Sequence, residues 1–374
     1  MTENKYIVYS VLDVVMLKIS IDVAQSIKEE VAFKYRYFQH TDDQPNQEKK
    51  CRSTINVYPF REFKEGFRDV TVSHDYRYSL YDFCSSPSRQ LCVQKTKSGL
   101  DIFTDGENII DLLVLICLVT NGYALVHAAG VEKENQAILL CGMGGIGKTQ
   151  FAASFIFNSE FSVLGDDLII ISENGYAYPF LKPFMLKPQH KDFIPSKYSK
   201  NKLGKVLRGL KNKFIIFMKD NLPLAGLIKS FLKKDTTFTN TLRQFLQFNS
   251  VDLIPTYPWE IEGLYLSEGA KCCSLIQVHR SLGPQIGSYE QKANNADINI
   301  AIIINEYRST IWALGWMGSA GVVDIEYFYE NLHKVYKKFL SEVDIKNFIF
   351  PIEMEPKEYI SSLITSITGE KDPQ

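Results

Sequence analysis

QAILLCGMGGIGKTQFAASFIF occupies residues 136–157, and its central part, residues 142–149, matches the pattern G-x-x-x-x-G-K-[ST] at every defined position. Glycines let a backbone wrap closely around phosphate oxygens and point successive N–H groups at them. The short apolar run at 136–141 predicts a buried strand, and the apolar spacing at 149–157 predicts a helix. Because a helix N-terminus also attracts anions, this strand–loop–helix order predicts a phosphate-binding loop, here called the P-loop.

The P-loop residues have distinct expected tasks. We expect Lys148 to bring a fixed positive charge to the β- and γ-phosphates of a nucleotide, and Thr149 to offer its hydroxyl to Mg²⁺. The motif does not distinguish ATP from GTP. The expected nucleotide-binding residues are Gly142, Met143, Gly144, Gly145, Ile146, Gly147, Lys148, Thr149 and Gln150.

Composition is that of an ordinary globular protein. Of 374 residues, 45% are hydrophobic and 23% are charged, and the formal net charge of −1 gives no argument for a nucleic-acid or membrane partner. The longest apolar stretch, residues 109–119, contains Asp111 and is too short to span a bilayer. The first residues lack the order of a signal peptide, and seven irregularly spaced cysteines favour reduced thiols, so we expect a cytoplasmic protein.

Metal-binding patterns are missing from the sequence. Six histidines are scattered, and the adjacent pair Cys272 and Cys273 does not have the spacing of metal ligands. The metal that we expect is therefore the one that accompanies the nucleotide.

The chain before the P-loop is expected to be mostly β. Strand-like runs lie at 6–12, 70–72 and 91–94, helical periodicity at 19–33, and a polar loop at 40–52. Tyr, Phe and Arg alternate over 53–90, which favours a half-buried sheet, with a binding face as the alternative. A buried helix is expected at 109–121, then two strands at 125–131 and 137–141 around a polar turn. We divide the chain into a β-rich accessory or substrate region, 1–110, and a domain at 111–374.

The chain after the P-loop alternates strands and helices. Strands are expected at 161–165, 168–172, 214–218, 274–279, 298–304 and 347–352. Helices are expected within 222–246, at 335–343 and at 357–367. An extended proline-rich segment covers 178–188, and a basic cluster covers 197–213, either as a solvated surface or as a loop that meets an acidic substrate.

Asp166 and Asp167 lie 18 and 19 residues after Lys148, at the end of the strand that follows the P-loop helix. Neighbouring strand ends in such a sheet meet at the edge where ligands bind. One carboxylate can accept a proton from a substrate hydroxyl and the other can hold Mg²⁺. The alternative is an Asp pair that caps a turn, where Asp is common.

Five further residues are weaker candidates. His127, on a strand just upstream of the P-loop strand, either contacts phosphate or is a satisfied core histidine. Arg280 and Arg308 are candidates for a second phosphate clamp, with surface ion pairs as the alternative. Lys182 and Lys187 flank the proline-rich segment and are candidates for lining an acceptor groove.

Taken together, these motifs resemble the kinase domain of bacterial HPr kinase/phosphorylase. A histidine-bearing strand, the P-loop and an Asp-Asp pair match in order and nearly in spacing. The resemblance implies an α/β P-loop kinase core similar to that of phosphoenolpyruvate carboxykinase, with a β-rich N-terminal region. It implies transfer of the γ-phosphate of ATP to a serine hydroxyl of a peptide or small protein. The family tends to oligomerise, so a homo-oligomer is a further expectation.

The resemblance also implies roles for individual residues. Asp166 would be the base toward the accepting serine, His127 would lie beside the transferred phosphate, and Thr149 would bind Mg²⁺. Beside these, the residues themselves predict that Lys148 holds the phosphates and that Asp167 supports the metal.

The chain departs from that family at several points. Gln150 stands where the family often has Glu, and no Arg-Gly-rich segment is found, so reversal by phosphorolysis is not implied. Residues 1–110 do not resemble the regulator domain, and the chain is more similar to stand-alone relatives, some found beside peptide-modifying enzymes. A kinase for a sugar or amino acid is one alternative. GMGGIGKT also resembles the P-loop of STAND-type signalling ATPases, which makes a nucleotide switch the other alternative.

Overall fold

The computed structural model describes residues 6–39, 51–64, 70–73, 75–155, 160–186, 254–261, 264–284, 286–288, 295–355, 358–360 and 363–364. Contacts divide the chain into two units, Met1–Phe184 with Thr256–Gln374, and Met185–Pro255. In the second unit the described residues belong to the paired strands β15 (Phe184–Leu186) and β16 (Ile254–Thr256). The fold is mixed α/β, and the first unit contains two mixed sheets.

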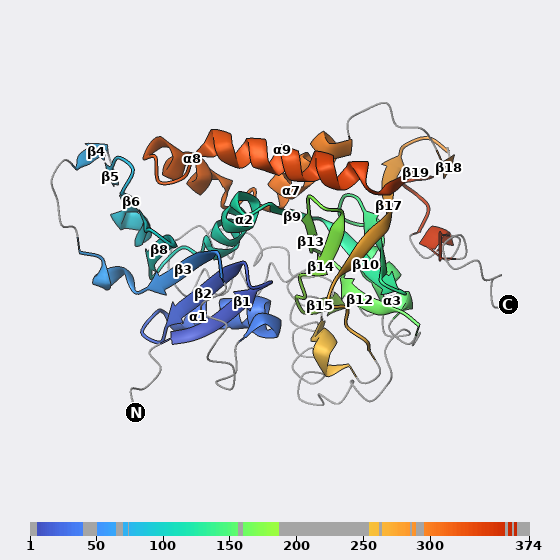
Figure 1. Ribbon diagram of the computed structural model, residues 1–374, viewed down its shortest axis with the longest axis horizontal. Coiled ribbons are helices and arrows are strands. Elements are labelled where there is room, and N and C mark those ends of the chain that lie inside the picture. The colour runs from blue at the N-terminus through green and yellow to red at the C-terminus, as the bar shows by residue number, and fades with distance from the viewer. Residues whose placement is uncertain are drawn as a thin grey trace, which may run out of the picture. The chain divides into compact units, whose positions relative to one another are not determined.

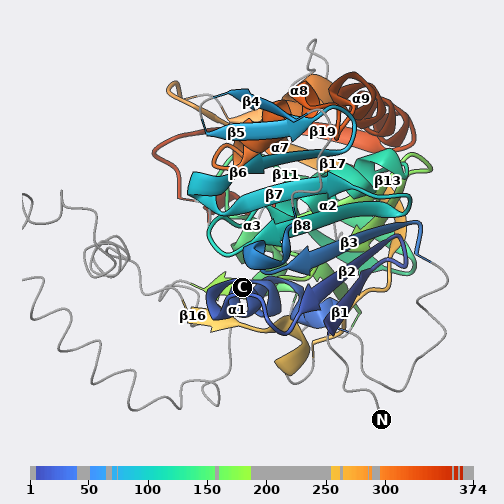
Figure 2. The same ribbon diagram turned by 90° about the vertical axis from the view of Figure 1, so that its left-hand side faces the viewer.

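Within the described residues, sheet A has eight strands, which lie side by side in Figure 2. Their order is β1 (Tyr6–Val11), β2 (Val15–Ser20), β3 (Ser53–Tyr58), β8 (Gly99–Thr104), β7 (Leu91–Lys95), β6 (Phe83–Ser86), β5 (Tyr76–Ser79) and β4 (Thr71–Ser73). Strand β3 is parallel to both neighbours, and the other pairs are antiparallel. Helix α1 (Gln25–Tyr35) buries Ile27, Val31 and Tyr35, which follow helical spacing, in the core.

Sheet B carries the P-loop. Its described strands are β9 (Tyr123–Val126), β10 (Ala128–Lys133), β11 (Gln136–Cys141), β12 (Ser162–Gly165), β13 (Ile169–Ser172), β14 (Tyr176–Pro179), β17 (Ala270–Ser281), β18 (Gly287–Ser288) and β19 (Asp344–Pro351). The order is β12-β10-β11-β17-β14-β13-β9, with β19 along β17 and β18 beside β19. The β10–β11 hairpin turns at Glu134 and Asn135, both with positive φ, as a two-residue turn of this kind requires.

Helices complete the first unit. They are α2 (Ile110–Thr120), α3 (Lys148–Ser154), α7 (Asn295–Glu306), α8 (Ile311–Ser319) and α9 (Ile325–Ser341). Helix α9 runs along α2 and α7 (Figure 1) and begins at Asp324, whose carboxylate accepts a hydrogen bond from the Tyr327 amide. Short 3₁₀ turns lie at Arg36–Phe38, Phe60–Glu62, Pro87–Arg89 and Pro258–Glu260.

Two apolar clusters form the core. The larger contains residues of sheet A, α1, α2, α7, α9 and one face of sheet B, and α2 is buried almost all round. The smaller lies on the α3 side of sheet B and includes Leu140, Ile146, Phe151 and Tyr359. The P-loop therefore lies between the buried strand β11 and a helix that packs on the sheet.

Several predictions made from the sequence are confirmed. The buried helix at 109–121 is α2, the strands at 161–165, 274–279 and 347–352 are β12, β17 and β19, and the helix at 335–343 lies in α9. The seven cysteines are free thiols. In the described part of the chain, no helix is long and apolar enough to cross a membrane.

The prediction of a strand at 298–304 is wrong, because these residues lie in α7. A run of isoleucines suits both a strand and a buried helix. The buried positions Ala296, Asn299, Ile300 and Ile303 follow the spacing i, i+3, i+4, i+7, which only a helix places on one face.

Three other boundaries also differ from the predictions. Helical periodicity predicted at 19–33 gives way to β2, which ends at Ser20, and to α1, which begins at Gln25. The helix predicted at 149–157 is α3, which ends at Ser154. The strand predicted at 125–131 is interrupted at His127. Lys187, most of the polar loop at 40–52, the basic cluster and the elements predicted over 214–246 lie outside the described residues.

Candidate functional site

Hydrogen-bond register brings three distant parts of the sequence to one edge of sheet B. Strand β10 is antiparallel to both neighbours, and it pairs Ala128 with Cys141 of β11 and Gly130 with Gly165 of β12. The beginning of β10 therefore lies beside the ends of β11 and β12. His127, Gly142 and Asp166 immediately adjoin these three strand ends, so they gather at the same edge.

Glycine is needed at two points of the P-loop. A Cβ atom on Gly142 would lie 2.6 Å from the carbonyl oxygen of Val278, so the loop approaches β17 too closely for a side chain. Gly147 has φ of 80° and precedes Lys148, the first residue of α3. A left-handed residue followed by a right-handed one turns successive N–H groups toward one side and forms a concavity for anions.

The structure has room for an anion beside this loop. A Cβ atom on Gly144 or Gly145 would meet no heavy atom within 4 Å. Met143, at the start of the same turn, is 57% exposed. The open side of the loop therefore suits a phosphate, whereas its other side is packed through the buried Ile146.

Lys148 lies back across the loop. Its side chain is buried, and Nζ donates to the carbonyl oxygens of Gly142 at 3.0 Å and Met143 at 3.3 Å. Burial lowers the pKa of Lys148, while the charge of Asp167 opposes this shift. The ammonium is thus held over the P-loop by backbone oxygens, close to where phosphates would lie.

The two aspartates occupy different environments. Asp166 is 8% exposed, whereas the Asp167 side chain is 48% exposed. Burial and the charge of Asp167 raise the pKa of Asp166 to about 7, although a hydrogen bond from Thr149 and the charge of Lys148 act in the opposite direction. A buried carboxyl with a pKa near 7 can accept a proton at neutral pH, and the exposed carboxylate is available to a cation.

His127 lies between β9 and β10, where the chain leaves one strand for the next, rather than within a strand. Its Nδ1 is 3.2 Å from Oε1 of Glu306, and its Nε2 is 3.9 Å from Oδ1 of Asp167. Burial and the charge of Lys148 lower the pKa of His127 to about 4, while Asp167 opposes the shift. The imidazole is therefore neutral at pH 7 in the protein alone.

Glu306 was missed by the sequence analysis. It ends α7, and its side chain is 38% exposed at the site. The same helix is fixed further back by Asn299, whose Nδ2 donates to Oε1 of the buried Gln277 at 3.1 Å. Gln277 pairs with Cys141, so α7 is anchored to the strand beside the P-loop strand. The helical spacing of its buried positions was the signal that could have placed Glu306 at a helix end.

Two of the weaker basic candidates, Lys182 and Arg308, differ in how deeply they are buried. Lys182 is half-buried, and its positive charge acts on Asp111, His127 and Glu306. Arg308 also acts on Glu306 but is exposed.

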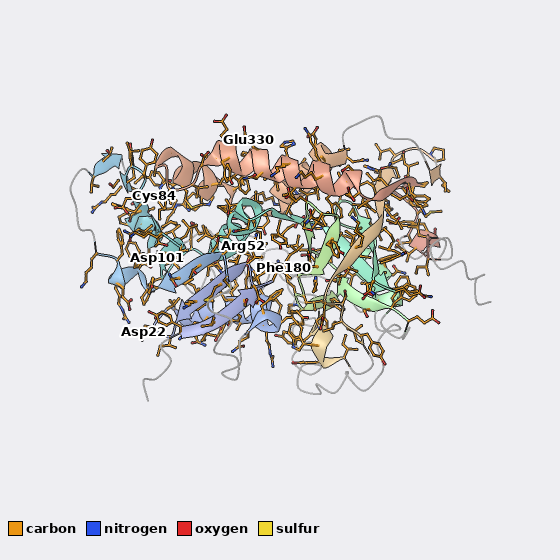
Figure 3. All side chains as sticks on the ribbon, viewed as in Figure 1. Asp22, Arg52, Cys84, Asp101, Phe180 and Glu330 are labelled. Carbon is orange, nitrogen blue, oxygen red and sulfur yellow. The ribbon has the colours of Figure 1, made fainter. Side chains whose placement is uncertain are left out.

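Phe180, two residues before Lys182, connects this region to α1. Phe180 is labelled in Figure 3. Its ring centre lies 5.9 Å from that of Tyr35 at the end of α1. The Lys182 ammonium lies 5.2 Å from the centre of the same Phe180 ring. Lys182 is thus held between α1 and the P-loop edge.

Arg280 contacts the C-terminal segment. Its guanidinium donates to the carbonyl oxygens of Ile352 and Met354 and to the hydroxyl of Tyr359. Gln150 is half-exposed on α3, where its carbonyl accepts a hydrogen bond from Ser154.

The protein oxygens at this edge suit a magnesium ion only when a nucleotide supplies further ligands. In the part of the chain that the structure describes, no group of three or more His, Cys, Asp and Glu side chains could hold a metal ion by itself. Mg²⁺ typically takes one or two protein oxygens and completes its shell with phosphates and water. Thr149 and Asp167 can supply those protein oxygens.

No protein-family model matches the sequence, and no curated protein matches it.

Proposed function

We propose that the protein is an ATP-dependent kinase with a P-loop core of the HPr kinase type. In this proposal ATP and Mg²⁺ bind at residues 142–150, and the γ-phosphate passes to a serine hydroxyl of a peptide or small protein. The observation that carries the proposal is Asp166, a buried carboxyl with a pKa near 7 that is hydrogen-bonded to Thr149 of the P-loop. Phosphate binding alone needs no proton acceptor at that point, whereas transfer to a hydroxyl does.

In this proposal different residues would bind the phosphates, hold Mg²⁺ and accept the proton. Loop amides and Lys148 would bind the phosphates, with Nζ exchanging the carbonyl oxygens of Gly142 and Met143 for phosphate oxygens. Thr149 and Asp167 would hold Mg²⁺, which supplies neutralisation of phosphate charge. Asp166 would accept the proton of the attacking hydroxyl.

His127 and Glu306 would act as a pair. A polyphosphate adds negative charge that offsets Lys148 and favours the protonated imidazole. Glu306 beside Nδ1 would stabilise that imidazolium, so that Nε2–H faces the phosphoryl group. Glu306 therefore orients His127, and His127 contacts the group being transferred.

The proposal also includes the acceptor, the cellular location and the oligomeric state. The serine acceptor rests on the family resemblance, and a small-molecule hydroxyl is the alternative acceptor. Seven free cysteines support a cytoplasmic location, and a homo-oligomer is part of the proposal by analogy with the family.

The proposal is tested with γ-labelled ATP, Mg²⁺ and a cell extract as the source of acceptors. Wild type is compared with Lys148→Ala and with Lys338→Ala, a control that removes a surface lysine bonded to Glu173. We expect label on a discrete protein or peptide with wild type and Lys338→Ala, but not with Lys148→Ala. Label on a metabolite would favour the small-molecule kinase. Nucleotide binding without any labelled acceptor would reject the kinase in favour of a nucleotide switch.

A further inference from the structure

A buried tyrosine of the C-terminal segment contacts the P-loop. The Tyr359 hydroxyl lies 2.9 Å from the carbonyl oxygen of Ile146, which is inside the P-loop. The Tyr359 ring stacks on Phe350 with ring centres 4.1 Å apart and planes 11° apart. This ring is almost fully buried in the smaller core cluster together with Ile146. Tyr359 is therefore fixed in place by packing as well as by the hydrogen bond.

Arg280 donates a second hydrogen bond to the same hydroxyl. Its Nη1 lies 3.3 Å from the Tyr359 hydroxyl, and its Nη2 donates to the carbonyl oxygen of Met354 at 2.7 Å. A guanidinium has donors but no acceptor, so the hydroxyl oxygen must accept from Arg280. The hydroxyl hydrogen is then free to point at Ile146, and the tyrosine donates to the loop.

Because of peptide geometry, this hydrogen bond also sets the direction of the next N–H, which lies on the other side of the loop. No peptide bond in the described residues is cis, and in a trans peptide the C=O and the following N–H point in opposite directions. A carbonyl of Ile146 turned toward Tyr359 therefore turns the N–H of Gly147 away from the core. Gly147 has φ of 80° and no Cβ atom, so rotation of this peptide meets little steric resistance unless another group holds it.

We propose that Tyr359, oriented by Arg280, is a positioning residue that holds the Ile146–Gly147 peptide with its N–H aimed at the nucleotide phosphates. This inference rests on the proposed nucleotide binding, and it assigns the C-terminal segment to the phosphate site. Tyr359 itself does not touch the nucleotide.

The test compares two tyrosines that make the same kind of buried bond. Tyr359→Phe removes the bond to Ile146 and keeps the stack on Phe350. Tyr336→Phe is the matched control, since Tyr336 is buried and its hydroxyl donates to the carbonyl oxygen of Leu125 in β9 rather than to a P-loop residue. Tyr336→Phe loses one neutral hydrogen bond, whereas Tyr359→Phe loses the bond to Ile146 and the bond from Arg280, so a somewhat larger loss of thermal stability is expected for Tyr359→Phe.

The two variants are expected to differ in their affinity for MgADP. We expect the Kd to rise about three- to tenfold in Tyr359→Phe, in line with the loss of one well-placed donor, and to stay at the wild-type value in Tyr336→Phe. In the kinase assay KM for ATP rises and kcat changes less. Equal Kd values for the two variants would overturn the inference while leaving nucleotide binding intact.

The outcomes also distinguish this inference from the proposed function. If the wild-type protein binds no MgADP, the proposed nucleotide binding and the proposed role of Tyr359 are both rejected. A second measurement needs no variant: the ¹⁵N–¹H resonance of Gly147 in wild type is followed as MgADP is added. A clear shift supports the assigned donor, and an unmoved resonance at saturation rejects it, even if Tyr359→Phe fails to fold.

Discussion

Asp111 at the start of α2 and Asp166 at the P-loop edge are carboxyls that burial affects in the same way, with opposite net results. Asp111 accepts hydrogen bonds from Nζ of Lys34 at 2.9 Å and from the hydroxyl of Tyr35 at 2.8 Å. Burial would raise the pKa of Asp111, but the charges of Lys182 and Lys34 and these two bonds outweigh it, and the pKa falls. At Asp166 the charge of Asp167 adds to burial, and the pKa rises to about 7.

The difference teaches that partners, rather than burial, determine what a carboxyl does. Asp111 is held as an anion between cations, which suits a structural role. Asp166 is held near the point of protonation beside a second carboxylate, which suits proton transfer. Lys182 links the two regions, because its charge acts on Asp111 and also on His127 and Glu306.

The largest expected effect is on the transfer rate of Asp166→Asn. The amide keeps the shape but cannot accept a proton, so the rate should fall by about 10² to 10⁴. The melting temperature should not fall, because a neutral group relieves repulsion by Asp167. Initial rates, MgADP affinity and thermal melting are measured together. A variant that transfers phosphate at the wild-type rate would place the proton acceptor elsewhere.

Asp111→Asn should show the reverse pattern. We expect the free energy of unfolding to fall by about 1–3 kcal/mol at pH 7, because Lys34 loses one of its two charged acceptors, keeping Glu30, while the Asp111 side chain is only 24% exposed. Activity per folded molecule should be kept. Urea unfolding measures the loss. The matched control is Asp101→Asn on sheet A (Figure 3), where burial raises the pKa of a carboxyl bonded to Asn56, so a smaller cost is expected.

The two carboxyls should also give opposite pH dependences of stability in the absence of nucleotide. For Asp111, whose folded pKa is lowered, the advantage of wild type over Asp111→Asn is full above the unfolded value of about 4 and is lost as pH falls through the folded pKa. For Asp166, whose pKa is raised, the folded state binds more protons between about pH 4 and 7. Wild type should therefore lose stability relative to Asp166→Asn as pH rises across that range.

Urea unfolding of the three proteins from pH 2.5 to 8 measures both slopes, the Asp111 slope below about pH 4 and the Asp166 slope between about pH 4 and 7. Parallel curves for the two variants would show that the two carboxyls do not differ in the way described.

A smaller effect is expected for Glu306→Gln. Loss of the charge beside Nδ1 of His127 should lower kcat by about tenfold and leave KM for ATP nearly unchanged. Glu342→Gln, which removes a surface partner of Lys271, serves as the control. A wild-type kcat for Glu306→Gln would remove Glu306 from the site.

Local signals account for what the sequence predicted well. The P-loop motif consists of eight consecutive residues, and α2 is apolar on nearly every side. Both elements can therefore be recognised without knowledge of distant contacts. The Asp pair and His127 were also placed near the P-loop, because each adjoins the end of a short strand. Their meeting at one edge follows from the antiparallel register of β10.

Long-range pairing accounts for what the sequence did not predict. The isoleucines of α7 suit a strand as well as a helix, and although their spacing could have indicated the helix, the contact of Glu306 with His127 depends on how that helix packs in the completed fold. Tyr359 lies 213 residues from Ile146, and no pattern near either residue indicates that they meet. Positioning contacts of this kind are set by the completed fold.

The anchoring of α7 has a consequence for how this sequence can change over time. Asn299 fixes the helix to Gln277, and Glu306 reaches His127 two turns later, about 10 Å along the axis. One inserted or deleted residue between them would rotate Glu306 by about 100° around that axis. Homologues that share this site should therefore keep the number of intervening residues constant and Ile300 and Ile303 apolar, while the exposed side chains between them vary.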